Sequence, residues 1–133
     1  MDAVFRELNR REKDLLERLL DAATHGRDKL RTQLNHVKAQ QILEDGTLRL
    51  QCNGGTGAPG RSALVAEATY KDADGADVAV ILHLKKGGFM SMLEIIRYDG
   101  LPITHPPSAQ KLVLLMPESP GQKDTPSAPP AGG

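Results

Sequence analysis

The pattern of apolar and polar positions divides the chain into a helical first part and a strand-forming remainder. Asn9, followed by Glu12, has the spacing of a helix start: the Asn side chain accepts from exposed amides, and the carboxylate lies near the positive end of the helix dipole. His25 and Gly26 are the expected end of this helix. Its apolar residues recur every three or four positions: Leu15, Leu16, Leu19, Leu20 and Ala23.

Two shorter stretches flank this helix. A short second helix is expected from Asp28, where apolar residues again recur at helical intervals: Leu30, Leu34 and Val37. Three apolar residues near the N-terminus either extend the first helix backward or fold over its start: Val4, Phe5 and Leu8.

After the second helix the apolar period changes to two, which predicts β-strands. "VKAQQIL" and "TLRLQC" flank Glu44-Asp45-Gly46, and an Asp-Gly pair between alternating runs indicates a hairpin. "SALVAEATY" leads through "KDADGAD" to "VAVILHL", and "KKGG" leads to "FMSMLEIIRY". The strands are too short for parallel crossover connections. The sequence therefore predicts an α+β fold, with the N-terminal helix packed on an antiparallel meander of about five strands.

Length and C-terminal composition set the expected domain organisation. A chain of 133 residues corresponds to one domain, expected over residues 1–116. "KLVLLM", residues 111–116, is either one more strand or a packed extension. Residues 117–133 are rich in Pro, Gly and Ser and contain no residue suited to a core, so a disordered tail is expected there.

The balance of charges indicates which classes of partner to expect, and the cysteine content indicates the redox state of the compartment. Seventeen basic residues balance seventeen acidic ones, so neither nucleic acid nor a membrane surface is expected as a partner. Cys52 is the only cysteine, which excludes an intramolecular disulfide and indicates a reducing compartment. The charged N-terminal stretch is unlike a signal peptide, and a cytoplasmic protein is expected. A possible nucleic-acid-binding set lies near the N-terminus: Arg10, Arg11, Arg27, Lys29 and Arg31. Nucleic-acid binding through these residues is the weakest function class, because acidic residues are interleaved with them and no aromatic platform accompanies them.

Two loop motifs are similar to ligand sites without matching them. The stretch from Gly55 to Ser62 has Arg61 where a phosphate loop has lysine, and strand patterns follow it where a helix is required, so a hairpin linker is expected. "DADGAD" has its glycine at the fourth position and His83 at the twelfth, whereas a calcium loop needs glycine at the sixth and Glu at the twelfth; a solvated hairpin turn is expected. No catalytic set, metal site or cofactor is predicted; whether the protein is an enzyme stays undecided, although no sequence feature argues for one.

The most informative feature is that two central strands are apolar on both faces. A helix layer covers one face of a sheet, so the other face needs a cover. We interpret that second face as a candidate partner surface, made by Ile81, His83, Met90, Met92, Glu94 and Ile96. Its cover is residues 111–116, a second copy of the chain, or a different protein. Methionines at such a face suit adaptable contacts.

Two functions follow from this interpretation. The first is protein binding through the apolar sheet face, as in immunity proteins or stoichiometric inhibitors, or self-association. The alternative is a small-molecule-binding domain or enzyme with a pocket between helix and sheet, in which His83 and Glu94 would act.

"RELNRREKDLLERLL" and "EATYKDADGADVAVILHLKKGGFMSMLEIIRYDGLPI" together resemble the DUF6984-type family of small uncharacterised bacterial proteins. The shared features are the N-terminal helix, the Asp-x-Asp-Gly turn, a glycine turn before a Leu-Glu strand, and a closing Asp-x-x-Pro-Ile. The resemblance covers roughly residues 6–103, and Lys85, Lys86 and Gly87 depart from the more acidic turn of the family. It implies a compact α+β fold and carries over no catalytic residue.

Overall fold

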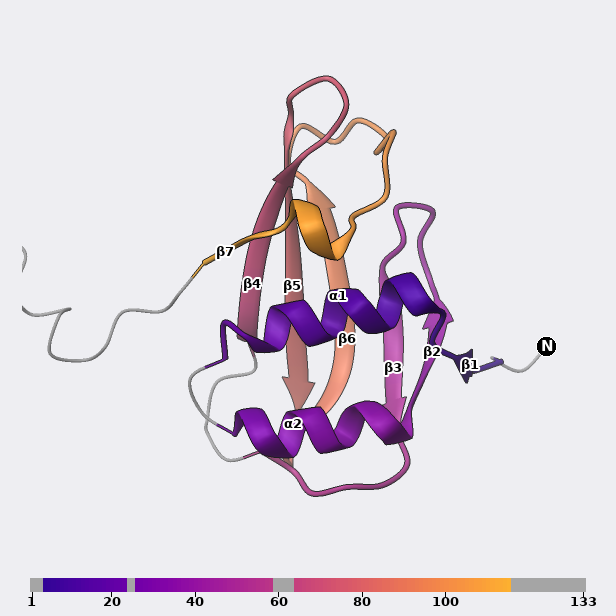
Figure 1. Cartoon of the computed structure of the whole chain (residues 1–133). Helices are drawn as coiled ribbons and strands as arrows, with labels where there is room; N and C mark the ends of the chain where they lie inside the picture. Colours follow the sequence, from indigo (N-terminus) through magenta and orange to yellow (C-terminus); the bar gives the residue numbers. More distant parts are fainter. Residues whose placement is uncertain (1–3, 24–25, 59–63, 116–133) are drawn as a thin grey trace, which may run out of the picture.

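The computed structural model describes residues 4–23, 26–58 and 64–115, with the backbone alone at residues 64 and 65 (Figure 1). Within these ranges two α-helices pack against one sheet, and the predicted α+β class is confirmed. The helices are α1 (Arg10–Leu20) and α2 (Arg27–Gln33), with short 3-10 helices at Leu34–His36 and Ala109–Lys111. The strands are β1 (Arg6–Glu7), β2 (Val37–Gln41), β3 (Leu48–Cys52), β4 (Leu64–Lys71), β5 (Asp77–Lys85), β6 (Phe89–Arg97) and β7 (Val113–Leu114).

The described strands form an antiparallel sheet in the order β1-β2-β3-β6-β5-β4-β7. The predicted meander is wrong at one junction, because β4 follows β3 in the chain but lies beyond β6 and β5. Tight turns specify neighbouring strands, as they do for the hairpins β2–β3, β4–β5 and β5–β6. The glycine-rich stretch between β3 and β4 is no tight turn, and it is long enough to pass the ends of two strands spaced about 4.8 Å apart.

The start of α1 is built as the sequence predicts. The Asn9 side chain accepts a hydrogen bond from the Glu12 amide at 2.8 Å, and the Glu12 carboxylate accepts one from the Asn9 amide at 3.0 Å. Arg6 of β1 donates two further bonds to the Glu12 carboxylate, at 2.7 and 2.8 Å. The residues before α1 therefore form a short edge strand tied to the helix, rather than extending it.

The end of α1 differs from the prediction. The helix stops at Leu20 instead of at His25 and Gly26, and His25 lies outside the described residues. Arg27 binds the chain where the helix ends: its guanidinium donates to the carbonyls of Leu20, Asp21 and Ala23 at 2.8–3.2 Å. Gly26, with a φ of 71°, is the N-cap residue before α2.

Gln33, at the end of α2, is a buried polar residue that fixes two loops. Its amide nitrogen donates to the carbonyls of Thr56 and Gly88, both at 2.9 Å, and its amide oxygen accepts from the Met90 backbone at 3.0 Å. The side chain is fully buried, and these three bonds satisfy it. The loop after β3 and the β5–β6 turn are thereby held against the helix layer.

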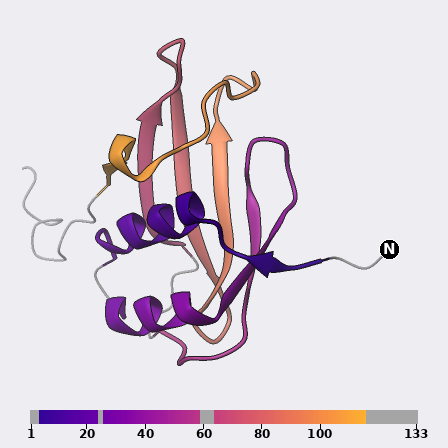
Figure 2. The same ribbon diagram turned by 45° about the vertical axis from the view of Figure 1, so that its right-hand side comes forward.

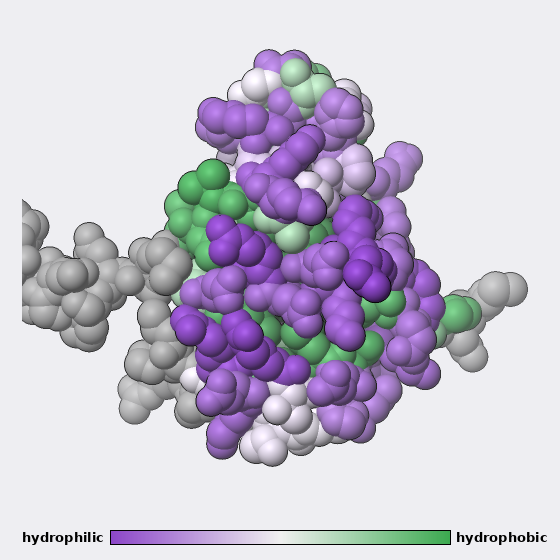
Figure 3. All heavy atoms as spheres, viewed as in Figure 1, coloured by the Kyte–Doolittle hydropathy of each residue, from purple (hydrophilic) through white to green (hydrophobic). Residues whose placement is uncertain are grey.

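The core lies between the helices and one face of the sheet. Both helices lie on the same side of the strands, and in the two views no described segment crosses the other side (Figures 1 and 2). The outward surfaces of the helices are mostly hydrophilic, while a hydrophobic patch lies beside β7 (Figure 3). Core residues from α1 and from the two central strands include Leu16, Leu19, Val80, Leu82, Leu93 and Ile95, each at most 3% exposed.

The stretch "KLVLLM" joins the sheet at its edge and does not cover the open side within the described residues. Leu112 is buried in the helix-side core, and β7 pairs with β4 through Thr69 opposite Val113. Val113 and Leu115 remain 63% and 45% exposed. Met116 and the tail predicted over residues 117–133 lie outside the described residues.

Candidate functional site

The sheet surface that points away from the helices carries five of the six predicted partner residues. Ile81 and His83 of β5 alternate with the buried Val80, Leu82 and Leu84, so they lie on the side away from the helices. We call this surface the open face and define it by its described residues from β3 to β6: Arg49, Glu67, Thr69, Ala79, Ile81, His83, Met92, Glu94 and Ile96.

Met90 is the exception, and its predicted place was wrong. The β5–β6 register shifts between His83 and Leu84, so that His83 lies opposite Met92 and Leu84 opposite Met90. This bulge turns Met90 to the helix side, where it is fully buried. The prediction assumed that residues alternate strictly between the two faces along β6, and such an assumption cannot reveal a bulge.

The side chains of the open face differ in their exposure. Ala79 and Ile81 are 1% and 7% exposed, while Met92 and Ile96 are half-buried. Glu67 of β4 and Glu94 of β6 lie opposite Ile81 on the two neighbouring strands, so an apolar centre is bordered by carboxylates. Arg49, opposite Met92, is exposed. The face is therefore amphipathic rather than uniformly apolar.

His83 and Glu94 form a pair on this face, with 2.8 Å between Nε2 and Oε1. Their side chains are 28% and 34% exposed, so water reaches both groups. The Glu94 carboxylate accepts this hydrogen bond and thereby orients the imidazole ring. The pair lies on the side opposite the helices, so it does not line the pocket between helix and sheet in which the small-molecule or enzyme hypothesis placed it.

A groove of about 720 Å³ adjoins the open face at the end of β6. The sequence reading missed it, because it forms between two loops that are distant in the chain. We call it the hairpin groove. Its walls are the tip of the β2–β3 hairpin, the last residues of β6 and the loop that follows: Leu43, Glu44, Asp45, Thr47, Glu94, Ile95, Ile96, Arg97, Gly100, Leu101, Pro102 and Ile103. Two predicted partner residues, Glu94 and Ile96, belong to both surfaces.

Thr47 lies where the groove opens. The pairing of β3 with β6 ends at Leu48 opposite Leu93, and the hairpin tip then leaves β6. The buried Thr47 hydroxyl accepts a hydrogen bond from the Ile95 amide at 3.0 Å and lies 3.4 Å from the Ile95 carbonyl oxygen, to which it donates. One side chain therefore satisfies the backbone of β6 where a strand partner is missing.

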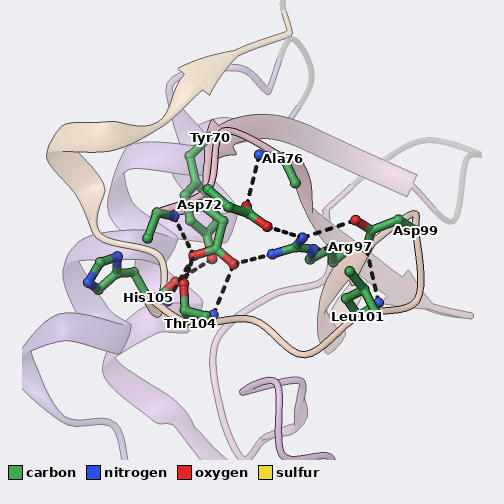
Figure 4. A network of polar contacts seen from close by, with 10 residues as sticks. Tyr70, Asp72, Ala76, Arg97, Asp99, Leu101, Thr104 and His105 are labelled. Atoms are coloured by element: carbon green, nitrogen blue, oxygen red, sulfur yellow. Dashed lines mark hydrogen bonds and ion pairs between the residues drawn. The ribbon is translucent and has the colours of Figure 1, made fainter.

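The opposite wall of the groove is fixed by a buried carboxylate, Asp72, at the end of β4 (Figure 4). Asp72 accepts bonds from the Thr104 amide and hydroxyl, from the amides of Ala73 and His105, and from Arg97, at 2.7–2.9 Å. Burial alone would raise its pKa, but the bonds from Thr104, Ala73 and His105 outweigh burial and hold the pKa well below its usual range. The loop after β6 is thereby pinned to the β4–β5 turn.

Arg97, almost fully buried at the end of β6, binds three carboxylates at once (Figure 4). Its guanidinium contacts Asp99 at 2.8 and 3.0 Å, Asp72 at 2.8 Å, and Asp74. The bonds with Asp99 and Asp74 raise the pKa of Arg97 further above its ordinary value. Asp99 also accepts from the Leu101 amide at 3.0 Å, which orients the loop along the groove.

In the part of the chain that the structure describes, neither of the two loop motifs forms the ligand site that it is similar to in sequence. "DADGAD" forms the predicted β4–β5 hairpin turn with Gly75 at a φ of 87°, but Asp72 and Asp74 bind Arg97, so the turn is not merely solvated. No group of three or more potential metal ligands occurs among the described residues. The Gly55–Ser62 motif lies partly outside them, and the chain continues from Leu64 as β4, a strand where a phosphate loop requires a helix.

The family model of a domain of unknown function, DUF6984, matches residues 5–107. The chain belongs to the DUF6984 family. The match spans β1 to β6, both helices and the Asp72–Arg97 network, whereas β7 lies beyond it. The resemblance read from the sequence is thus confirmed, and the DUF6984 assignment supplies no activity. Comparison with curated proteins and with solved structures found no match to this chain. In the described part of this DUF6984 chain, none of the helices is long and apolar enough to cross a membrane.

Proposed function

We propose that this DUF6984 chain is a protein-binding module whose contact surface is the open face together with the hairpin groove. The observation that carries the proposal is the continuity of the two surfaces through Glu94 and Ile96. A folded partner lying over the uncovered strands would reach into the groove without changing the helix side. An immunity-like or inhibitor-like role would fit such a surface.

The burial pattern supports contact by a protein. Met92 and Ile96 are half-exposed side chains beside the buried Ile81, and they form an adaptable apolar centre. Glu67, Glu94 and Arg49 border that centre with charge, which is the arrangement of an interface with an apolar core and a polar rim. Leu43 and Leu101, 55% and 58% exposed, add apolar surface at the groove.

Affinity capture from a lysate of the source organism tests the proposal. The tagged full-length chain is compared with a Met92→Asp, Ile96→Asp double variant, and captured complexes are weighed intact by native mass spectrometry. We expect a stoichiometric protein partner with the wild-type chain and its loss in the variant, because two buried charges at the centre of an interface are strongly unfavourable.

The matched control is a Thr32→Asp, Asn35→Asp double variant, which adds the same two charges on the exposed helix side. Circular dichroism and urea unfolding establish that both variants fold. A partner that survives the sheet variant, or that is lost in both variants although both are folded, contradicts the proposed surface. Recovery of the wild-type chain alone contradicts protein binding, and recovery of a dimer lost only in the sheet variant identifies the partner as a second copy.

A further inference from the structure

We infer that the hairpin groove holds an extended segment of the partner protein in which a Lys or Arg side chain lies between apolar side chains. The inference rests on the proposed function and names the chemistry of the segment that the groove would take. The volume of about 720 Å³ lies within the range of roughly 300–1,000 Å³ found for sites that enclose ligands.

The apolar part of the segment follows from the walls. Leu43 from the hairpin tip and Leu101 from the loop after β6 are two of the large hydrophobic side chains that the described chain leaves most exposed. Pro102 and Ile96 add to the apolar lining. Apolar side chains of a bound segment would remove these leucines from water, which is the role of central contacts in most protein interfaces.

The cationic part follows from the charges. Three carboxylate residues, Glu44, Asp45 and Glu94, line the groove, and Arg97 is the basic residue among its lining. The Arg97 guanidinium is buried and already bound by three aspartates, so it leaves no positive charge free for a ligand. The potential in the groove is therefore negative, and Lys or Arg complements it.

The shape favours an extended segment. The groove occupies the space beside Glu94 to Arg97 of β6 where a longer β3 would run, since β3 pairs with β6 only through Leu48 and Arg49. A chain in β-conformation would enter this space along the strand direction. The Thr47 hydroxyl already satisfies the Ile95 backbone, so affinity must come from side-chain contacts more than from new backbone pairing.

The same charges argue against two other occupants. In a symmetric dimer the same patch faces itself, which would bring the carboxylates of both copies together. Nucleic acid would bring its phosphates to the same carboxylates. A basic segment of another protein is the occupant that the charges favour.

Selection from a random peptide display library on the immobilised full-length chain tests the inference. We expect the selected peptides to contain Lys or Arg flanked by apolar residues. Their affinity, measured by fluorescence anisotropy, should fall between ionic strengths of about 0.01 M and 1 M, where the Debye length shrinks from roughly 30 Å to 3 Å. Selection of acidic or uncharged sequences, or no enrichment at all, would overturn the inference.

Two groove variants locate the binding. Leu43→Ser with Leu101→Ser should weaken the selected peptides at least about tenfold, as expected for central contacts. Glu44→Gln with Glu94→Gln should weaken them roughly three- to thirtyfold at low salt and less at high salt. The matched controls are Val113→Ser with Leu115→Ser on the β7 edge and Glu17→Gln with Asp28→Asn on the helices, which make the same chemical changes away from the groove.

Equal losses in the control variants would place the peptides elsewhere and overturn the inference. Capture of the cellular partner with the same variants distinguishes failure of the inference from failure of the proposed function. A cellular partner lost with Met92→Asp and Ile96→Asp but retained in both groove variants leaves protein binding intact and refutes the basic segment. Absence of both the cellular partner and the selected peptides refutes the two together.

Discussion

Replacing Thr47 by valine tests how the hairpin groove is built. Valine has nearly the same shape, and Thr47 is only 1% exposed, so the change removes the hydroxyl and little else. The Ile95 amide then loses its 3.0 Å acceptor inside the protein. A lost hydrogen bond costs about 1 kcal/mol, and a buried unsatisfied amide costs roughly 1–3 kcal/mol. We expect a free energy of unfolding about 2 kcal/mol lower than that of the wild type.

Urea unfolding followed by circular dichroism measures this difference. With a slope of about 2 kcal/mol per molar urea, the midpoint should fall by about 1 M. Thr47→Ser retains the hydroxyl and should lose less than Thr47→Val. Thr69→Val, on the half-exposed open face, should change stability by less than about 0.5 kcal/mol. A midpoint for Thr47→Val equal to that of the wild type, or to that of Thr69→Val, would refute the role given to the hydroxyl.

Three further predictions concern the loops that hold the fold. The pKa of Asp72 is depressed in the folded state, so its contribution to stability is complete above about pH 4 and is lost as the pH falls below that value. Unfolding free energies measured from neutral to acid pH should therefore fall less in Asp72→Asn than in the wild type, and parallel curves would contradict this. Burial, and then the charge of Asp72, raises the pKa of Tyr70 to about 12. In a Tyr98→Phe variant, the tyrosinate absorbance should therefore appear near pH 12, and the stability that Tyr70 contributes should be lost as the pH rises from about 10 toward 12. Ionisation of Tyr70 near pH 10 in the folded protein would contradict this prediction. An alanine Cβ at position 57 would overlap a backbone oxygen of the β5–β6 turn, whereas at position 75 it meets only the strain of a φ of 87°. Thermal unfolding should therefore show a larger loss of stability for Gly57→Ala than the roughly 1 kcal/mol expected for Gly75→Ala. The reverse order would show that the loop containing Gly57 is loosely packed.

Local signals predicted the local structure. The capping box at Asn9 and Glu12 and the glycine turns of three hairpins depend on residues close in the chain, and each forms as expected. The apolar character of both faces of β5 predicted a sheet whose second face needs a cover, and no described segment lies over that face (Figure 2). Strand order was predicted wrongly where a long connection replaced a tight turn, because pairing of β3 with β6 depends on contacts far apart in sequence.

The candidate site was predicted only in part for the same reason. Five open-face residues follow from alternation along two strands, and Met90 was misplaced by a bulge. The hairpin groove and the burial of Asp72 with Arg97 depend on residues from separate turns. The available signal was an arginine at the end of an apolar strand, facing the core, since a buried guanidinium requires carboxylate partners. Its partners are Asp72 and Asp74 of the "DADGAD" turn and Asp99, two residues farther along the chain.

Photo-cross-linking across the molecular surface tests the central claim most directly. A photoreactive phenylalanine analogue is placed, one position at a time, at Leu43, Ile96 or Leu101 and, as controls, at Glu17 or Thr32 on the helices, and the full chain is irradiated in cells of its source organism. The account predicts one discrete cross-linked protein band from the groove and open-face positions and none from the helix positions. Bands of the same protein from the helix positions, or no band from Ile96 and Leu101, would contradict it.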